Sequence, residues 1–447
     1  MKFPLGAGAC LLALGLAAPL AARQGVPVAS AAGAVTAATP LDTFDAAWRV
    51  LRENYVAATA SHVDWDAIRA ELRPRAERAR TEEEARELVR EMLARVGQSH
   101  FAILPAPVAS AMSGASVPTD DAGSLGLDVR LLGRELVVTR VEDGSPADRQ
   151  GVRAGWTLSH VGARPVADAL AAVGDGPDHV RGFQAWALIM AMLRGRAGEE
   201  ATLGFLDAQG QAIARTLVRS PERGQPVKLG HLPTLFARLD SRSVTRNQRT
   251  MGVIAFNVWM TPVSRQFDEA MDKLRGTDGL VIDLRGNPGG VLTMIMGISG
   301  HFVGEPVNLG VIKTRESELK LMANPRLVNV SGQRVPTYAG PVAILVDNGS
   351  YSASEIFSGG MQAIGRARVF GGRTPGGALP AVLERLPGGD VLQYAIGDFV
   401  TATGQRIEGR GVVPDEIVVP SKADLLAGRD PVLDAALEWL SKGNAIR

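Results

Sequence analysis

Serine hydroxyls stand at the end of a short apolar run, at positions 350, 352 and 354. The run at 342–346 predicts a buried strand, residues 347–349 predict a turn, and residues 352–362 predict a helix. A serine between a strand and a helix presents its hydroxyl beside the helix N-terminus. The free N–H groups of that terminus stabilise negative charge, as an oxyanion in acyl transfer requires. Ser352 is therefore a candidate nucleophile.

The same residues also fit a purely structural role. Ser352 and Glu355 have the Ser-x-x-Glu spacing of a capping box, in which each side chain bonds the other residue's backbone N–H. On this motif alone, helix capping and nucleophilic catalysis both account for the serine. The remaining motifs of the chain have to separate the two explanations.

Length and composition set outer limits. A chain of 447 residues with 46% hydrophobic residues is long enough for a sizeable core, and its length predicts roughly two to four domains. The 48 basic and 47 acidic residues balance, so charge does not indicate nucleic acid or an anionic membrane surface as a partner. The single cysteine, Cys10, lies in the N-terminal segment, and no disulfide is expected. No CxxC or His-x-His pair occurs, and neither a metal nor a cofactor is predicted.

Residues 1–31 have the proportions of a secretory signal peptide followed by a leader. A weakly basic start precedes an apolar segment, Leu5 to Ala22, that is rich in alanine, leucine and glycine. Cleavage is expected after Ala22 or after Ala31. Pro19 interrupts the apolar segment, so no permanent membrane span is expected in the mature chain. The protein is therefore expected to be exported, to the periplasm or the extracellular space.

Residues 41–104 predict a small helical domain. Helical periodicity is clearest at Trp65 to Leu72 and at Thr81 to Val96, and an earlier helix is expected to begin with Thr43 as its cap. His100 follows the third helix, in a loop before an apolar run. A lone histidine is usually structural, but the loop position makes His100 a candidate base.

Residues 105–121 indicate a linker, and residues 122–220 follow it. Two strand-like runs, Gly123 to Arg130 and Glu135 to Val141, lead to a short helix between glycines. In this order of elements, residues 122–220 resemble a PDZ domain. In the PDZ family a Gly-Leu-Gly-like loop binds a peptide C-terminus: its N–H groups take the carboxylate while the peptide adds a strand. By this resemblance, peptide binding is assigned to Ser124, Leu125, Gly126 and Leu127. A β-rich spacer without a ligand is the alternative.

Residues 221–447 alternate strand and helix patterns, which predicts a parallel α/β domain with right-handed crossovers. The apolar run from Gly279 to Arg285 is typical of a buried parallel strand. Asp283 and Arg285 near its end are expected to form an ion pair rather than to act in catalysis. Asp415 is expected to be a turn residue.

Three motifs in this region occur in order: Val281 to Gly290, Gly349 to Glu355 and Glu408 to Asp415. With the PDZ-like region before them, they resemble the C-terminal-processing, or tail-specific, serine peptidases, a family that includes the tricorn protease core. The resemblance covers nearly the whole mature chain. It implies a multidomain α/β protein with an N-terminal helical domain, a PDZ-like β-rich domain and a crotonase- and ClpP-like catalytic core.

The nucleophile of this family is the middle serine of a Ser-Ala-Ser-Ala-Ser-Glu motif, and it corresponds to Ser352. The resemblance implies an oxyanion hole made by the N–H of Ala353 and of a glycine, Gly289 or Gly290. Glycine at that place lets the backbone approach the substrate closely.

The chain departs from the better-known branch of the family, which activates its serine with the lysine of a Phe-Gly-Lys-Gly motif. Gly377 stands at the lysine position. The tricorn-like branch instead uses a Ser-His pair in its helical region and a glutamate near the C-terminus. Ser99, His100 and Glu408 match those positions. The resemblance therefore implies His100 as general base and then general acid, with Ser99 and Glu408 in a polar relay.

These residues predict an exported serine endopeptidase that cleaves unfolded or C-terminal segments of proteins through an acyl-enzyme. Its partners are then protein or peptide substrates, and homo-oligomerisation is left open. On the same fold, the chain could instead be a catalytically inactive peptide- or ligand-binding protein, since the lysine is missing. It could also hydrolyse another acyl substrate, such as an ester. The joint presence of Ser352, His100 and Glu408 favours an enzyme.

Overall fold

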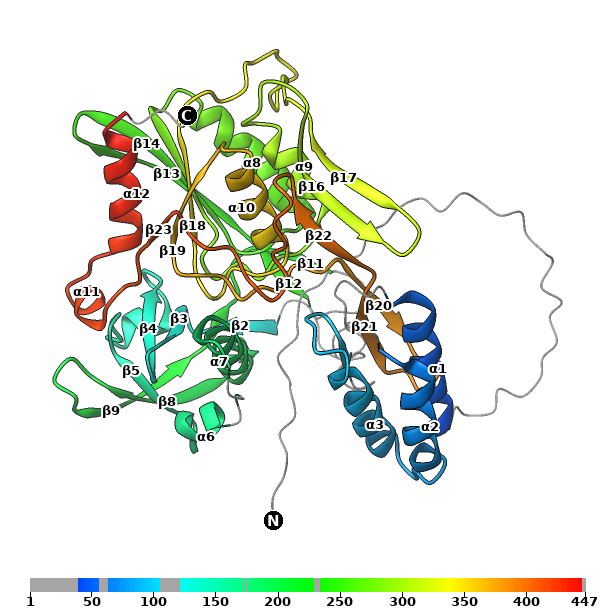
Figure 1. Ribbon diagram of the computed structural model, residues 1–447. Coiled ribbons are helices and arrows are strands. Elements are labelled where there is room, and N and C mark those ends of the chain that lie inside the picture. The colour runs from blue at the N-terminus through cyan, green and yellow to red at the C-terminus, as the bar shows by residue number, and fades with distance from the viewer. Residues whose placement is uncertain are drawn as a thin grey trace.

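The computed structural model describes residues 39–55, 63–104, 121–171, 173, 176–228 and 234–443. The predicted signal peptide and leader, and the predicted linker except Asp121, lie outside these residues. The described chain forms a small helical domain, a β-rich domain and a larger α/β domain that lies above both in the view of Figure 1. Within the described residues, no helix is both long and apolar enough to cross a membrane.

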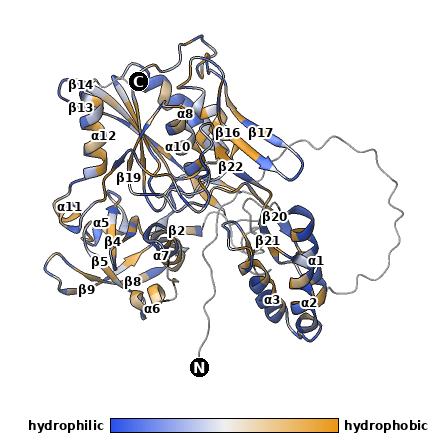
Figure 2. Cartoon of the chain, viewed as in Figure 1, coloured by the Kyte–Doolittle hydropathy of each residue, from blue (hydrophilic) through white to orange (hydrophobic). Residues whose placement is uncertain are grey.

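The N-terminal helices are α1 Pro40–Asn54, α2 Trp65–Ala76 and α3 Glu82–Ala94. Each begins after a side chain that accepts a backbone N–H, those of Thr39, Asp64 and Thr81. The cap predicted at Thr43 is wrong. Thr43 is buried inside α1, because Thr39 and Asp42 form a capping box one turn earlier. Blue and orange residues alternate on these helices in Figure 2, as expected of amphipathic helices.

A strand pair from far along the chain completes this domain. β1 (Ala102–Leu104) pairs with β21 (Val391–Ala395), which pairs with β20 (Ala381–Arg385). Leu392 and Tyr394 join the apolar core of the helices, and Figure 1 shows β20 and β21 beside α1. The range predicted for this domain, residues 41–104, does not include β20 and β21.

The β-rich domain is built on an antiparallel sheet in the order β3-β4-β5-β8-β9. These strands are Leu127–Leu132, Glu135–Val141, Thr157–Val161, Glu200–Leu206 and Ala212–Val218. The helix α7 (Asp178–Leu193) packs against the edge strand β3. The smaller elements are β2 Ala122–Ser124, α5 Pro146–Arg149, β6 Arg164–Pro165, α6 Val166–Ala171, β7 Gly195–Arg196 and β10 Ser220–Pro221. The predicted strand from Glu135 to Val141 and the short helix are present, whereas the run from Gly123 to Arg130 is divided between β2 and β3 at residues 125–126. The PDZ assignment stays a prediction.

The α/β domain has a central sheet in the order β13-β14-β15-β18-β19-β23. The strands are Leu239–Arg246, Arg249–Phe256, Gly279–Asp283, Val342–Val346, Arg368–Gly371 and Glu416–Ile417. All neighbours from β14 to β23 are parallel, whereas β13 pairs antiparallel with β14. The predicted parallel α/β arrangement is confirmed for this sheet.

Helices cover both faces of that sheet. Ile254, Ile282 and Ile344 pack with α8 (Thr261–Leu274), α9 (Thr293–Ser299) and α10 (Ala353–Ala363). On the other face, Val281 and Leu345 pack with α12 (Pro431–Ser441). The sequence pattern did not reveal a second sheet, β17-β16-β22, or the pair β11-β12. The remaining elements are β11 Gln225–Val227, β12 Leu235–Ala237, β16 Val307–Thr314, β17 Glu318–Ala323, β22 Gly397–Thr401 and α11 Lys422–Leu426.

Candidate active site

Ser352 stands at a sharp turn between a strand and a helix. β18 ends at Val346, and α10 begins at Ala353 with Ser352 as its N-cap. The Ser352 backbone has φ 55° and ψ −116°, a conformation that costs a residue with a Cβ about 1–3 kcal/mol. Its N–H donates to the Gly377 carbonyl oxygen at 3.1 Å and to Glu355 Oε2 at 3.2 Å. The predicted strand, turn and helix are confirmed here, in a backbone conformation that the surroundings impose.

The flanking serines are engaged in backbone contacts. Ser350 Oγ donates to the Leu284 carbonyl oxygen at 2.8 Å, and Ser354 Oγ donates to the Asn287 carbonyl oxygen at 2.9 Å. Both hydroxyls therefore hold the turn against the neighbouring loop. Ser352 alone among the three combines the strained backbone with a position at the helix N-terminus.

Glu355 ties this turn to the loop at 374–377. Besides the N–H of Ser352, its carboxylate accepts the Thr374 hydroxyl at 2.5 Å, Gly376 N–H at 2.7 Å and Gly377 N–H at 2.9 Å. Glu355 is fully buried, and burial raises its pKa to about 7, although the hydrogen bonds from Thr374, Gly376 and Gly377 lower it. The capping partner expected at this position is present and also anchors a second loop.

Ser99 links His100 to Glu408. Ser99 Oγ lies 2.6 Å from His100 Nδ1 and donates to Glu408 Oε2 at 2.9 Å. Because the single hydroxyl hydrogen points to Glu408, the Ser99 oxygen must accept from Nδ1. The hydrogen-bond directions thus assign the proton of neutral His100 to Nδ1 and leave Nε2 as an acceptor.

Hydrogen-bond donors surround the buried carboxyl group of Glu408. Its oxygens also accept Ser99 N–H and Ala378 N–H, each at 2.9 Å. Burial raises the pKa of this carboxyl, and these donors oppose the rise. With donors on both oxygens, Glu408 is placed as an acceptor at the end of the series Glu408, Ser99, His100.

His100 shares backbone strain with Ser352. Four non-glycine residues of the described chain have positive φ: Asn247 and Gln248, in the turn between β13 and β14, and His100 and Ser352. Such strain persists only where the surroundings enforce it, and it concentrates at functional sites. Outside the turn between β13 and β14, the described non-glycine residues with positive φ are therefore His100 and Ser352, the predicted base and nucleophile.

Tyr351, the residue before the candidate nucleophile, lies against the imidazole. The two rings stack with centroids 5.1 Å apart and an interplanar angle of 14°. Phe183 of α7 stacks on the same tyrosine at 4.3 Å and 13°. The stack thus joins one residue from each domain: His100, Tyr351 and Phe183. No local sequence pattern signalled this contact.

Gly377, at the position of the missing lysine, faces the ring of Tyr351. A Cβ on Gly377 would lie 2.0 Å from Tyr351 Cε2 and 2.3 Å from its hydroxyl oxygen. The space into which a side chain at 377 would project is therefore filled by tyrosine.

The glycine loop, residues 286–290, lies close to Ser352. A Cβ on Gly289 would lie 2.7 Å from Ser352 Cβ and 3.0 Å from Ala353 N. Gly289 N–H donates to Asn287 Oδ1 at 3.0 Å. No hydrogen bond within the described part of the chain uses the N–H of Gly290 or of Ala353.

Arg130 connects the β-rich domain to the nucleophile turn. Its guanidinium donates to Asp128 Oδ1 at 2.6 Å and to Asp347 Oδ2 at 2.7 Å. Asp347 Oδ1 in turn accepts Gly286 N–H at 2.9 Å and Gly349 N–H at 2.8 Å. One buried arginine on β3 therefore braces both the glycine loop and the turn before Ser352.

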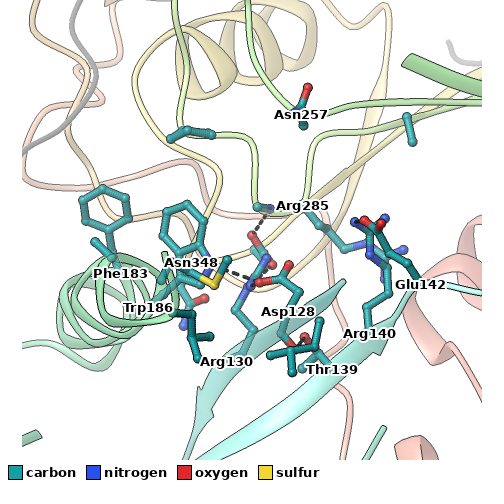
Figure 3. A pocket seen from close by; sticks show the side chains of 18 of the residues that line it. Asp128, Arg130, Thr139, Arg140, Glu142, Phe183, Trp186, Asn257, Arg285 and Asn348 are labelled. Atoms are coloured by element: carbon teal, nitrogen blue, oxygen red, sulfur yellow. Dashed lines mark hydrogen bonds and ion pairs between the residues drawn. The ribbon is translucent and has the colours of Figure 1, made fainter. Parts of the chain in front are cut away.

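A cleft of about 1550 Å³ lies between the β-rich and α/β domains. Figure 3 shows it, with Phe183 and Trp186 on α7 and Asp128 and Arg130 on β3. The residues predicted to bind peptide, Ser124, Leu125, Gly126 and Leu127, all line it. Its wall reaches Pro288 but not Ser352, which is 1% exposed.

The ion pair predicted between Asp283 and Arg285 is confirmed. Arg285 pairs with Asp283 at 2.7 Å and also with Asp430 at 2.8 Å. Asp415 lies at a bend directly before β23, and its Oδ2 accepts the N–H of Val369 in β19 at 2.8 Å. These carboxylates hold strand ends.

Comparison with known proteins identifies the class. Residues 250–418 match the model of peptidase family S41, and residues 37–94 match the tricorn protease C1 domain. The first match includes Ser352 and Glu408, whereas Ser99 and His100 lie between the two matches. The chain is a serine-type peptidase, and its residues 250–418 are similar to peptidase family S41.

The relatives are carboxyl-terminal-processing proteases. One from Synechocystis sp. is 26% identical over 409 residues, which cover 89% of this chain and 86% of that protein. A probable CtpA-like serine protease of Staphylococcus aureus is 25% identical over 295 residues, 65% of this chain and 51% of that protein. The chain thus spans about half the length of the staphylococcal relative.

Solved structures show the same fold. The photosystem II D1 C-terminal processing protease has a TM-score of 0.60 at 20% identity, covering 86% of this chain and 94% of its own. Mature CPAF complexed with lactacystin has a TM-score of 0.61 at 14% identity, covering 91% and 99%. The mixed α/β architecture is therefore that of C-terminal processing proteases.

Proposed function

We propose that the chain is a serine endopeptidase that cleaves unfolded or C-terminal segments of proteins, with a Ser-His-Glu arrangement in place of a Ser–Lys dyad. The observation that carries the proposal is the hydrogen-bonded series Glu408, Ser99, His100, which leaves His100 Nε2 as an acceptor. In this proposal the α/β domain is a crotonase- and ClpP-like core, and Ser352 is its nucleophile.

The chemistry is acyl transfer in two halves. Ser352 Oγ bonds to the carbonyl carbon of the scissile amide while His100 Nε2 takes its proton. The C–N bond then breaks, and His100 gives that proton to the departing amine. A water molecule repeats the sequence on the ester, so the peptide acid leaves and Ser352 is restored. Glu408 stays charged and, through Ser99, balances the positive charge of the imidazolium.

Backbone N–H groups stabilise the oxyanion in this scheme. Ala353, at the first position of α10, contributes one donor together with the helix terminus. Gly290 contributes the second, because Gly289 N–H is bonded to Asn287. Gly289 serves by lacking a side chain, since a Cβ there would collide with Ser352.

We propose further that the β-rich domain is PDZ-like and receives a peptide C-terminus at 124–127. β3 is an edge strand beside α7, so a peptide could add to it there. The Leu125 and Leu127 side chains are buried in the domain core, so the loop offers its backbone. Gly126 has φ 71°, and a Cβ there would lie 2.1 Å from Ser145 Cβ. The names of the relatives, carboxyl-terminal-processing proteases, support a chain end as substrate.

Export completes the proposal. The signal-peptide pattern at 1–31 supports action in the periplasm or outside the cell, and N-terminal sequencing of the protein recovered from those fractions tests it. A mature N-terminus at residue 23 or 32 is expected. Accumulation in the cytoplasm with Met1 retained would contradict export.

Turnover of casein, an unfolded protein, tests the peptidase assignment. The mature chain is expected to cleave it, and Ser352→Ala and His100→Ala are each expected to lower kcat at least ~10⁴-fold. Unchanged melting temperatures would show that both variants fold. Full activity of His100→Ala would move the base elsewhere and overturn the Ser-His-Glu arrangement. Binding of peptide C-termini without any cleavage would favour the inactive binding protein.

A further inference from the structure

We infer that Tyr351 is a positioning residue for His100, and that its ring has taken the place of the side chain missing at Gly377. This inference rests on the proposed function, because Tyr351 acts through the base. It assigns a role to the residue next to the nucleophile, which the motif resemblance left without one.

The first argument is the position of the ring. Tyr351 is 4% exposed, and its ring lies parallel to the imidazole of His100, which is fully buried. Ser99 holds one edge of the imidazole at Nδ1. A hydrogen bond at one ring atom fixes the tautomer but still permits rotation about that bond. Contact with a flat aromatic face restricts this rotation and so directs Nε2.

The second argument is the rigidity of the tyrosine itself. Its N–H donates to the Asn287 carbonyl oxygen at 3.0 Å, and its carbonyl oxygen accepts Ser354 N–H at 3.1 Å. The backbone of Tyr351 is thus bound to the glycine loop on one side and to the start of α10 on the other. Phe183 stacks on its ring. Because Tyr351 is bonded covalently to Ser352, a base that stacks on Tyr351 is held at a fixed distance from Ser352.

The third argument is mutual exclusion with residue 377. A Cβ at Gly377 would lie 2.0 Å from the tyrosine ring, so a lysine there and this ring position cannot coexist. The φ of Gly377 is not positive, and the three atoms nearest to an added Cβ all belong to the tyrosine. The glycine at position 377 therefore makes room for the Tyr351 ring, and it is not the remnant of a lost Ser–Lys dyad.

The ring rather than the hydroxyl carries this role. Tyr351 OH is 3.4 Å from His100 Nδ1, whereas Ser99 Oγ is 2.6 Å from the same atom. The Nδ1 hydrogen therefore goes to Ser99. A phenylalanine would keep the stack and lose only the longer contact.

Steady-state kinetics of the mature chain on one quenched fluorescent peptide test the inference. Tyr351→Phe is expected to keep kcat within ~3-fold. Tyr351→Leu is expected to lower kcat ~10- to 100-fold with little change in KM, since a displaced base slows the chemical step. In the His100→Ala background, Tyr351→Leu is expected to cause no further loss, because its partner is already gone.

Each outcome separates the inference from the proposed function. The positioning role alone would be overturned if Tyr351→Leu kept full kcat. It would also be overturned if Tyr351→Leu lowered kcat by the same factor in the His100→Ala background as in wild type. Full activity of His100→Ala would instead overturn the proposed base. If Tyr351→Leu fails to fold, Phe183→Leu removes the ring stacked on Tyr351 and should lower kcat ~3- to 10-fold, again only when His100 is present. An unchanged kcat in that variant would count against the stack.

Discussion

Ser99 and Glu408 are joined by two hydrogen bonds of 2.9 Å although 309 positions separate them in the sequence. One carboxylate accepts both the backbone N–H and the hydroxyl of Ser99. The helical domain, which supplies His100, is thereby attached to the C-terminal part of the α/β domain at the atom that sets the tautomer of the base.

Substitution within this pair should impair the chemical step. Ser99→Ala removes the acceptor for His100 Nδ1, and we expect kcat/KM to fall roughly 10²-fold. Glu408→Gln presents an amide N–H₂ to donors, which should reverse the Ser99 hydroxyl and cost roughly 10²–10⁴-fold. Ser159→Ala is the matched control, because Ser159 Oγ also lies beside a neighbouring histidine, His160 Nδ1, at 3.2 Å but at the surface. Equal activity of Ser99→Ala and the control would contradict the relay.

The pH dependence of stability should report the burial of Glu355. Its folded-state pKa is raised to about 7, above the ordinary value of about 4.3 for an unfolded chain. The folded state therefore binds more protons between these two values. This contribution to stability is fully present below pH ~4.3 and is lost as pH rises through about 7.

Urea unfolding of wild type and Glu355→Gln between pH 4 and 8 measures this term. The stability of wild type relative to the variant should decline with rising pH, by at most about 1.4 kcal/mol per pH unit, and level off above about 7. Glu305→Gln, at an exposed carboxylate, serves as the control. A difference that does not change with pH would show that Glu355 does not titrate in this window.

Filling the space at Gly377 should be destabilising only while the tyrosine is present. Gly377→Ala is expected to lower the free energy of unfolding by about 1–3 kcal/mol, because its Cβ meets the Tyr351 ring. The same substitution in a Tyr351→Ala background should cost almost nothing. Gly297→Ala, where nothing lies within 4 Å of the added Cβ, is the control. Equal costs in both backgrounds would refute the steric conflict.

Arg130 should be important for stability because it neutralises two carboxylates. Its side chain is 7% exposed and pairs with Asp128 and Asp347. Arg130→Met should lower the free energy of unfolding by roughly 3–5 kcal/mol, since it leaves both charges without their partner. Arg164→Met tests an exposed arginine of the same domain. Equal stability of the two variants would show that the buried pairs do not contribute.

Local patterns predicted the elements that carry chemistry. The apolar run before Asp347, the glycine in the turn and the Ser-x-x-Glu spacing act over a few residues, so the strand, the turn and the α10 start follow from the sequence. The amphipathic stripes of α2 and α3 are equally local. The cap placed at Thr43 shows the limit of this reasoning, because a stronger capping box began four residues earlier.

By itself, the sequence determined which residue types are available: a serine at a helix start, a loop histidine, a late glutamate and a glycine in place of lysine. Only the tertiary structure decided which of them meet. The bonds of Ser99 to Glu408, the stack of His100 on Tyr351 and the pairing of β1 with β21 join segments hundreds of residues apart. Such contacts are set by burial and shape complementarity of the whole chain, which leave no periodic trace in any one segment.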